Sequence, residues 1–295
     1  MAKLFFAKMN INEDIFEVYN KKKNLNKLLQ EIYLGIVTTT VVHDEQGGRL
    51  KFFDIDKFED NSIIRGRLGY IKKGVHSTYD PDKDTAIDIE DKNKIEYITF
   101  YFDVYKEMLA YTVNPVLTKK RVLKSFEELI KKETDIGVVF MLETDIAELK
   151  SELAKMDVLR KVILNIVPPN GDKKEFSTLF SLNADKVSEG GATSIKQEYS
   201  NRSKEGLNKD SSLIEDAKDG IALGYAKGAF YGKDNHGEDI EIHTEENSPY
   251  FKSVRSDQNK NKIVIADKGR AGIIDLLAYK AKIRENNRNG DSRKE

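Results

Sequence analysis

The chain has 295 residues, of which 39% are hydrophobic and 34% are charged, and its 49 basic and 50 acidic side chains give a formal net charge of −1. This balance produces no overall field that would attract nucleic acid or an anionic membrane, so either kind of binding needs a local group of charges. The chain contains no cysteine, which excludes disulfides, thiolate zinc sites, iron–sulfur clusters and cysteine nucleophiles.

The first third of the chain is predicted to form strands around one early helix. The patterns predict a strand at residues 3–9, an extended or looping piece at 14–19, a helix at 24–34, and strands at 36–42, 50–55 and 62–71. The tripeptide Gln46-Gly47-Gly48 precedes the strand at 50–55 and is typical of a hairpin turn. Gly66 and Gly69 indicate a bulge or a close backbone approach in the last strand.

Residues 74–93 are predicted to form a polar loop. The segment, GVHSTYDPDKDTAIDIEDKN, is long, and loops of such length are usually functional or mobile. Its acidic residues superficially resemble a calcium-binding loop, but it lacks the glycine at the sixth position and the spacing to a closing glutamate. We therefore expect a solvated loop.

The stretch at residues 98–132 predicts a hairpin followed by a helix with a basic first turn. Apolar and polar residues alternate over 98–103, which indicates a half-buried strand, and a turn at 104–107 leads into a returning strand at 108–113. Thr118 is a suitable N-cap for a helix that reaches Lys132 and carries one apolar stripe.

The rest of the chain is predicted to alternate between strands and helices. We expect strands at residues 135–142, 158–167, 223–231, 238–244 and 262–267, and helices at about 145–156, 175–182, from 212, and at 269–284. The strand–helix–strand run over 135–167 fits one half of a ferredoxin-like or similar split α/β unit.

These elements predict an α+β fold with mostly antiparallel sheets and packed helices. The Pro168-Pro169-Asn170-Gly171 stretch is the best candidate boundary. We expect an N-terminal α+β domain at residues 1–170 and a smaller C-terminal α+β region at 171–295. Within the latter, 188–209 would be a mobile connector and 286–295 a disordered tail.

The first turn of the helix after Thr118 is the best candidate site for nucleic acid or phosphate. Cations there oppose the positive end of the helix dipole, and a docked anion would offset that cost. Two basic pairs on predicted strands would contribute if those strands lie nearby. The candidate residues are Lys119, Lys120, Arg121, Lys124, Arg65, Arg67, Arg160 and Lys161. The alternative is a solvated basic turn balanced by Glu127 and Glu128.

Two further groups of polar residues suggest other chemistry. The segment EDIEIHTE places Asp239, Glu241, His243 and Glu245 on one face of a strand, as in a divalent-metal site or, as we prefer, the charged outer face of an edge strand. The segment FFDIDK offers carboxylates and a lysine as metal-dependent nucleases do, but no acidic partner can be assigned upstream of it. No Walker-A loop, Rossmann fingerprint or serine triad is present. We predict no cofactor and no metal, and assign no catalytic residue.

Four segments together resemble an uncharacterised bacterial family, a domain of unknown function found in phage-defence neighbourhoods. They are KLFFAKMNI, ITFYFDVYKEMLAYTV, VLRKVILNIVPPN and SPYFKSV. The layout is also loosely similar to that of the cytoplasmic phage-exclusion protein RexA. The resemblance implies an anti-phage, abortive-infection-like component that acts as a sensor or regulator and binds nucleic acid or a phage product, with dimerisation and DNA binding as for RexA. The open alternatives are a metal-dependent nuclease effector and a non-catalytic partner of a neighbour-encoded defence protein.

The amino-terminal sequence and hydropathy give an expectation for location. The start, MAKLFFAKMNINED, has an apolar run too short for a signal peptide, and no stretch approaches 18 apolar residues. We expect a cytoplasmic protein without membrane insertion, forming a homo-oligomer.

Overall fold

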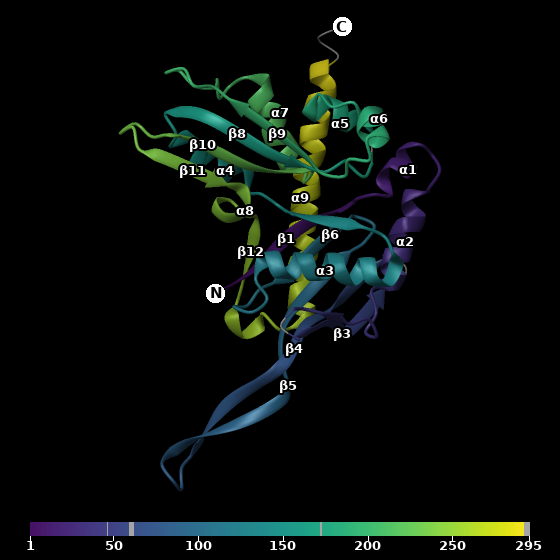
Figure 1. The fold of residues 1–295 in the computed structure, drawn as a ribbon, viewed down its shortest axis with the longest axis vertical. Helices are drawn as coiled ribbons and strands as arrows, with labels where there is room; N and C mark the ends of the chain where they lie inside the picture. Colours follow the sequence, from purple (N-terminus) through teal and green to yellow (C-terminus); the bar gives the residue numbers. More distant parts are fainter. Residues whose placement is uncertain (46, 59–61, 172, 292–295) are drawn as a thin grey trace.

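The computed structural model describes residues 1–45, 47–58, 62–171 and 173–291, and these form two antiparallel sheets with packed helices. The predicted α+β class is therefore confirmed (Figure 1). None of the helices in these ranges is both long enough and apolar enough to cross a membrane.

The first sheet has the strand order β12-β1-β6-β5-β4-β3-β2, and β7 also pairs with β1. Its strands are β1 (Ala2–Ile11), β2 (Val42–His43), β3 (Arg49–Phe58), β4 (Ile63–Asp80), β5 (Thr85–Asp103), β6 (Met108–Thr112), β7 (Val138–Leu142) and β12 (Phe251–Val254). β1 is buried along most of its length because it pairs with three other strands. Its apolar sequence fits a strand that packs on both faces.

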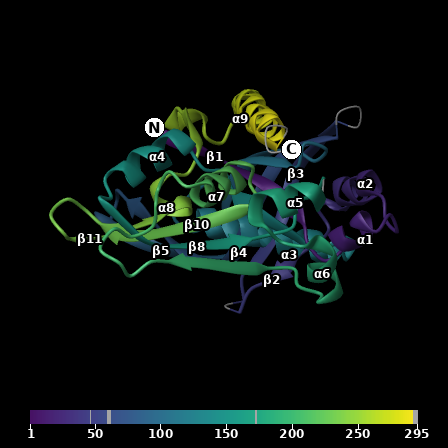
Figure 2. The same cartoon turned by 90° about the horizontal axis from the view of Figure 1, so that it is seen from above.

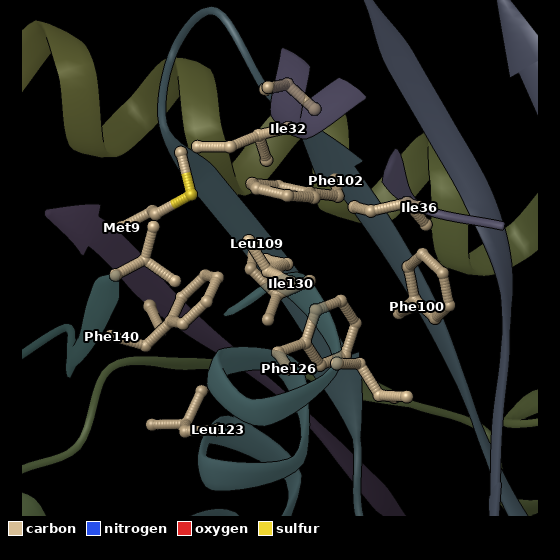
Figure 3. Packing of buried hydrophobic residues seen from close by; sticks show 14 of the residues in the cluster. Met9, Ile32, Ile36, Phe100, Phe102, Leu109, Leu123, Phe126, Ile130 and Phe140 are labelled. Carbon is tan, nitrogen blue, oxygen red and sulfur yellow. The ribbon is translucent and has the colours of Figure 1, made fainter. Parts of the chain in front are cut away.

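One face of the first sheet packs against α2 (Leu25–Gly35) and α3 (Lys119–Thr134). Figure 3 shows this core around Phe126 of α3. The Phe126 ring centroid lies 4.9 Å from that of Phe52 and 5.0 Å from that of Phe100, and Phe102 and Phe140 complete the cluster. The apolar stripe predicted for this helix therefore faces the sheet.

The other face of the first sheet packs against α9 (Lys262–Asp291). Two glycines let this helix approach closely. A Cβ atom on Gly272 would lie 2.2 Å from the Phe6 ring, and one on Gly269 would lie 3.1 Å from the Tyr101 ring. Ile273 of α9 belongs to this core, whereas Ile283 reaches the core of the second sheet, so α9 contacts both sheets (Figure 1). In Figure 2 the protein is viewed nearly along the axis of α9.

The second sheet has the order β11-β10-β8-β9. Its strands are β8 (Val158–Ile166), β9 (Ile195–Ser200), β10 (Ala226–Lys233) and β11 (Asp239–His243), and the nearby helices are α4 (Ile146–Ala154), α5 (Lys173–Phe180), α6 (Ala184–Glu189), α7 (Ser212–Ala222) and α8 (Thr244–Asn247). Two short helices, α1 (Ile15–Tyr19) and η2 (Ser256–Gln258), lie elsewhere in the chain.

Two buried ion pairs lie where the sheets meet. Lys280 of α9 contacts Glu143 at 2.5 Å, and their side chains are 2% and 1% exposed. Lys8 of β1 contacts Glu107 at 2.5 Å. Burial lowers the pKa of Lys280 to about 8. For Lys8, burial is again the largest single influence and lowers the pKa, but Glu107, Tyr225 and Glu143 together outweigh it, so the pKa is raised.

The prediction of a polar loop at residues 74–93 is wrong. β4 and β5 continue through this segment as a two-stranded ribbon that pairs as far as Asp80 and Thr85, and the chain turns at residues 81–84. We call residues 74–91 the arm; it projects from the body of the protein (Figure 1). Its β-branched residues alternate with polar ones, and each strand supplies the backbone partners that the other needs.

Several other predicted elements also differ from the structure. Residues 15–19 form α1, and of the strand predicted at 36–42 only Val42 lies in a strand. The strand predicted at 262–267 is the first part of α9, which runs on to Asp291 through residues expected to be disordered. Residues 292–295, Gln46 of the hairpin signal and Asp172 of the linker lie outside the described residues.

The domain division stays a prediction, although the split α/β unit is wrong. β7 pairs in the first sheet and β8 in the second, so the run at 135–167 is not one unit of a single sheet. The connector predicted at 188–209 contains β9.

Candidate nucleic-acid interface

The four basic residues at the start of α3 do not act alike. Lys119 donates a hydrogen bond to the Glu245 carbonyl at 2.6 Å, and burial lowers the pKa of Lys119. Arg121 bonds Asp44 at 2.8 Å and lies 3.9 Å from the centroid of the Tyr70 ring. These two side chains therefore tie α3 to other parts of the chain.

The other two residues of this turn point to solvent. Lys120 is exposed, and the Lys124 side chain is 70% exposed with its ammonium 3.5 Å from Glu128. A hollow of about 520 Å³ adjoins Arg121 and Lys124, but Asp44, Glu45 and Glu128 also line it. Of the two glutamates expected to balance a solvated basic turn, Glu128 lies near Lys124, whereas Glu127 accepts a hydrogen bond from the Phe140 amide at 2.8 Å. An anion site at this end of α3 stays a prediction.

The remaining predicted residues lie elsewhere. Arg65 and Arg67 are on β4 and pair with Tyr101 and Thr99, which puts them on the α9 side of the first sheet, opposite α3. Arg160 and Lys161 lie on β8 in the second sheet. The structure thus divides the eight predicted residues among three places.

One of these places, around Arg67, is a group of cations and aromatic rings on three neighbouring strands. Strand pairing aligns Lys51 with Gly69, Gly69 with Tyr97, and Phe53 with Arg67, so all five side-chain positions share the α9 side of the sheet. We call this surface the basic aromatic face. It comprises Arg49, Lys51, Phe53, Arg65, Arg67, Tyr97 and Lys260, and all but Lys260, which is exposed, are partly exposed.

Tyr97 is the centre of the basic aromatic face. The Arg67 guanidinium lies 4.8 Å from the centroid of its ring, and the Lys260 ammonium lies 4.7 Å from it. The Phe53 ring meets it edge to face, with centroids 5.6 Å apart and an interplanar angle of 83°. Cations within about 6 Å of a ring are attracted by its quadrupole, so these contacts fix the positions of both charges.

Gly69 makes this arrangement of rings possible. A Cβ atom at this position would lie 2.7 Å from the Phe53 ring and 2.9 Å from Ile95. What lies close to Gly69 is a side chain, and the strand pairing has no bulge at this residue. A β-carbon there would push the Phe53 ring away from Tyr97.

Two carboxylates border the face and are paired. Asp54 bonds Arg67 at 2.6 Å, and Asp56 bonds Arg65 at 2.9 Å and Lys262 at 2.9 Å. The hydrogen bond from Lys262 is the main cause of a lowered pKa at Asp56. Lys51 and Lys260 have no carboxylate partner within the described part of the chain, so the face keeps an excess of positive charge.

The metal and nuclease hypotheses find no assembled site in the described ranges. No group of three or more His, Asp or Glu side chains there is placed to hold a metal ion. Lys57 donates to the Tyr33 carbonyl at 2.7 Å instead of facing Asp54 or Asp56 as a catalytic lysine would. On β11, His243 contacts Glu241. Glu245, predicted on the same strand face, lies instead in α8 and pairs with Lys227 at 3.2 Å. β11 is the end strand of its sheet, as the preferred interpretation requires.

The fold and this surface define an α+β protein of two antiparallel sheets, one of which presents cations and aromatic rings to solvent. The chain matches the family described as a domain of unknown function, DUF4747, over residues 6–268, and it belongs to that family. A comparison with curated proteins finds no match.

Sequence reasoning identified only Arg65 and Arg67 of this face. It missed Arg49, Lys51 and Phe53 on β3, Tyr97 on β5, and Lys260, which precedes α9. A usable signal was present: Lys51 and Phe53 alternate with the buried Leu50 and Phe52, so the strand has one apolar and one basic aromatic side.

Proposed function

We propose that this protein binds single-stranded nucleic acid on the basic aromatic face. The observation that carries the proposal is the Tyr97 ring, flanked by the Arg67 and Lys260 cations and by the Phe53 ring. Non-specific single-strand binding uses this combination, because aromatic side chains stack on bases while neighbouring cations contact the phosphates.

Geometry favours a single strand over a duplex as the ligand. The face is the surface of an antiparallel sheet, and its rings can stack only on bases that are not already stacked in a helix. Its cations are local, which agrees with a chain whose overall charge is near zero. The face also extends along β3, β4 and β5, so it offers a track for several nucleotides.

Fluorescence anisotropy with labelled oligonucleotides tests the proposal. We expect single-stranded DNA or RNA to bind more tightly than the matching duplex, with affinity that falls as salt rises. Tyr97→Ala should cost roughly 1–3 kcal/mol for the base that it stacks. Lys51→Glu/Lys260→Glu should abolish binding at moderate salt.

A matched control separates this face from the start of α3. Lys120→Glu/Lys124→Glu makes the same change in charge on the opposite side of the sheet and should leave binding nearly unchanged. If the α3 variant lost oligonucleotide binding and the face variant kept it, the binding site would lie at the start of α3 and not on the basic aromatic face.

Anti-phage defence is the setting that we propose for this binding. The segments that resemble a phage-defence-associated family support it, and the ligand would then be nucleic acid exposed during infection, with the protein as sensor or regulator. Plating phage on cells that carry the wild type or Tyr97→Ala tests it. Equal plating on both strains and on cells without the gene would contradict a defence role.

A further inference from the structure

The arm carries apolar side chains that the protein itself leaves uncovered. Val75 and Tyr79, on one face of the ribbon, are 51% and 67% exposed, and Ile87 and Ile89, on the other face, are 40% and 42% exposed. A ribbon of two strands in water gains little from its own side chains, so a long ribbon with exposed apolar residues indicates that another surface covers it.

The charge of the arm narrows the choice of partner. Residues 76–91 contain six acidic side chains and one lysine. Strand pairing places Val75 opposite Glu90, Ser77 opposite Asp88 and Tyr79 opposite Ala86, so these six side chains share one face of the ribbon. That face is both acidic and apolar, and it fits a surface that is both basic and aromatic. Nucleic acid and anionic membranes would be repelled by it.

The chain has such a surface in the basic aromatic face, but its own arm cannot reach it. The arm and the face belong to the same strands, β4 and β5, and the paired ladder runs from one into the other. Folding the arm back would break that ladder. A second copy has no such constraint, and with a two-fold axis the contact would form twice, each arm on the other copy's face.

We propose that two copies of this chain form a dimer in which the arm of each lies on the basic aromatic face of the other. Asp88 and Glu90 of one copy would face Lys51 and Lys260 of its partner, and Val75 and Tyr79 would cover the Phe53 and Tyr97 rings. The strands of the arm extend about 20 Å beyond residue 74, at about 3.3 Å per residue, which is enough to cross three strands spaced about 4.8 Å apart.

Molar mass measured by light scattering after size exclusion tests the dimer without any nucleic acid. The wild type should have twice the mass of the chain at micromolar concentration. The arm variant is Asp88→Lys/Glu90→Lys and the face variant is Lys51→Glu/Lys260→Glu. Each should have a dimer dissociation constant at least roughly tenfold higher than that of the wild type.

Mixing the two variants gives the sharpest result. At the four positions that would meet, the arm variant carries only cations and the face variant carries only carboxylates, so each variant repels its own kind while the two complement each other. A one-to-one mixture should therefore restore the dimer mass. Two controls make equal changes elsewhere and should stay dimeric: Glu238→Lys/Asp239→Lys on the β10–β11 hairpin and Lys120→Glu/Lys124→Glu on α3.

Three outcomes would overturn the proposal. They are a wild type that is monomeric at about 100 µM, an arm variant that keeps the dimer mass, and a mixture that forms no complex. A further variant lacks the arm: an Asn-Gly turn replaces residues 75–90 and joins β4 to β5. This variant should also be monomeric, and it shows whether the arm itself, and not only its charge, holds the dimer together. In this dimer the partner's arm and a nucleic-acid strand would occupy the same face, so the two compete for it. Because mass is read without oligonucleotide, the dimer test does not depend on whether single strands bind, and the variant without the arm leaves the face open for the single-strand binding test.

Discussion

Replacing Lys280 by Met should destabilise the protein strongly, although the two side chains have similar volumes. The Lys280 ammonium is the one hydrogen-bond donor that the structure places on the Glu143 carboxylate within the described residues, and the second carboxylate oxygen of Glu143 is buried without a partner. The variant leaves a carboxylate that is 1% exposed without its cation. Breaking a buried ion pair in this way costs about 3–5 kcal/mol.

The double variant Lys280→Met/Glu143→Leu should recover most of this loss. Replacing a buried pair by apolar residues of similar size is often neutral or stabilising, since the cost of removing two charges from water disappears with them. Urea unfolding at pH 7, followed by circular dichroism, would compare the wild type, both single variants and the double variant. The reasoning would be refuted if Lys280→Met lowered the free energy of unfolding by less than about 1 kcal/mol. It would also be refuted if the double variant were no more stable than the less stable single variant.

Three further predictions concern pH, the core and the face. The free energy of unfolding should rise between about pH 8 and pH 10, because in this range Lys280 has lost its proton in the folded protein but keeps it in the unfolded chain. The free energy of unfolding should fall at higher pH, because burial raises the pKa of Tyr225 to about 12, so the unfolded chain loses the tyrosine proton first. Urea midpoints across this range should show the rise, and Lys280→Met should lack it. Phe126→Ala should cost about 3–5 kcal/mol in the same unfolding assay, since four aromatic rings surround Phe126; a cost below 1 kcal/mol would contradict that packing. Gly69→Ala should weaken oligonucleotide binding with little loss of helix content, and unchanged affinity would show that the position of the Phe53 ring does not matter.

Local signals in the sequence predicted the elements that local interactions determine. For α3, Thr118 caps the helix by accepting a hydrogen bond from the Arg121 amide at 3.4 Å, and Phe126 lies in the apolar stripe that the spacing indicated. β1 and α2 also lie where the patterns placed them. In each of these elements, one side of the chain is apolar and the ends carry recognisable residues.

The arm could not be predicted in that way, because its stability comes from pairing between strands and not from burial. Both faces of the ribbon are exposed, so its sequence has the polar composition of a loop. The prediction of a strand at the beginning of α9 was wrong for the opposite reason. Residues 262–267 are rich in β-branched residues, but the helix that they begin packs on both sheets, and this tertiary packing outweighs local strand propensity.

The sequence could not show which of the candidate cations are free, because partners far apart in the sequence decide it. Lys119 bonds a carbonyl 126 residues away, and Arg121 bonds a carboxylate 77 residues away. Neither partner is visible in the pattern around α3. The positions of Tyr97 and Lys260 on one surface likewise depend on the pairing of β4 with β5 and on where α9 begins.

Photocrosslinking tests the central claim most directly. Ultraviolet irradiation of the wild-type protein with single-stranded oligonucleotide, followed by mass spectrometry of the crosslinked peptides, identifies the side chains that touch bases. Binding on the basic aromatic face predicts crosslinks at Tyr97 and Phe53, competed by unlabelled single strands. Crosslinks confined to α3 or to the second sheet, or none under conditions where the protein binds, would contradict it.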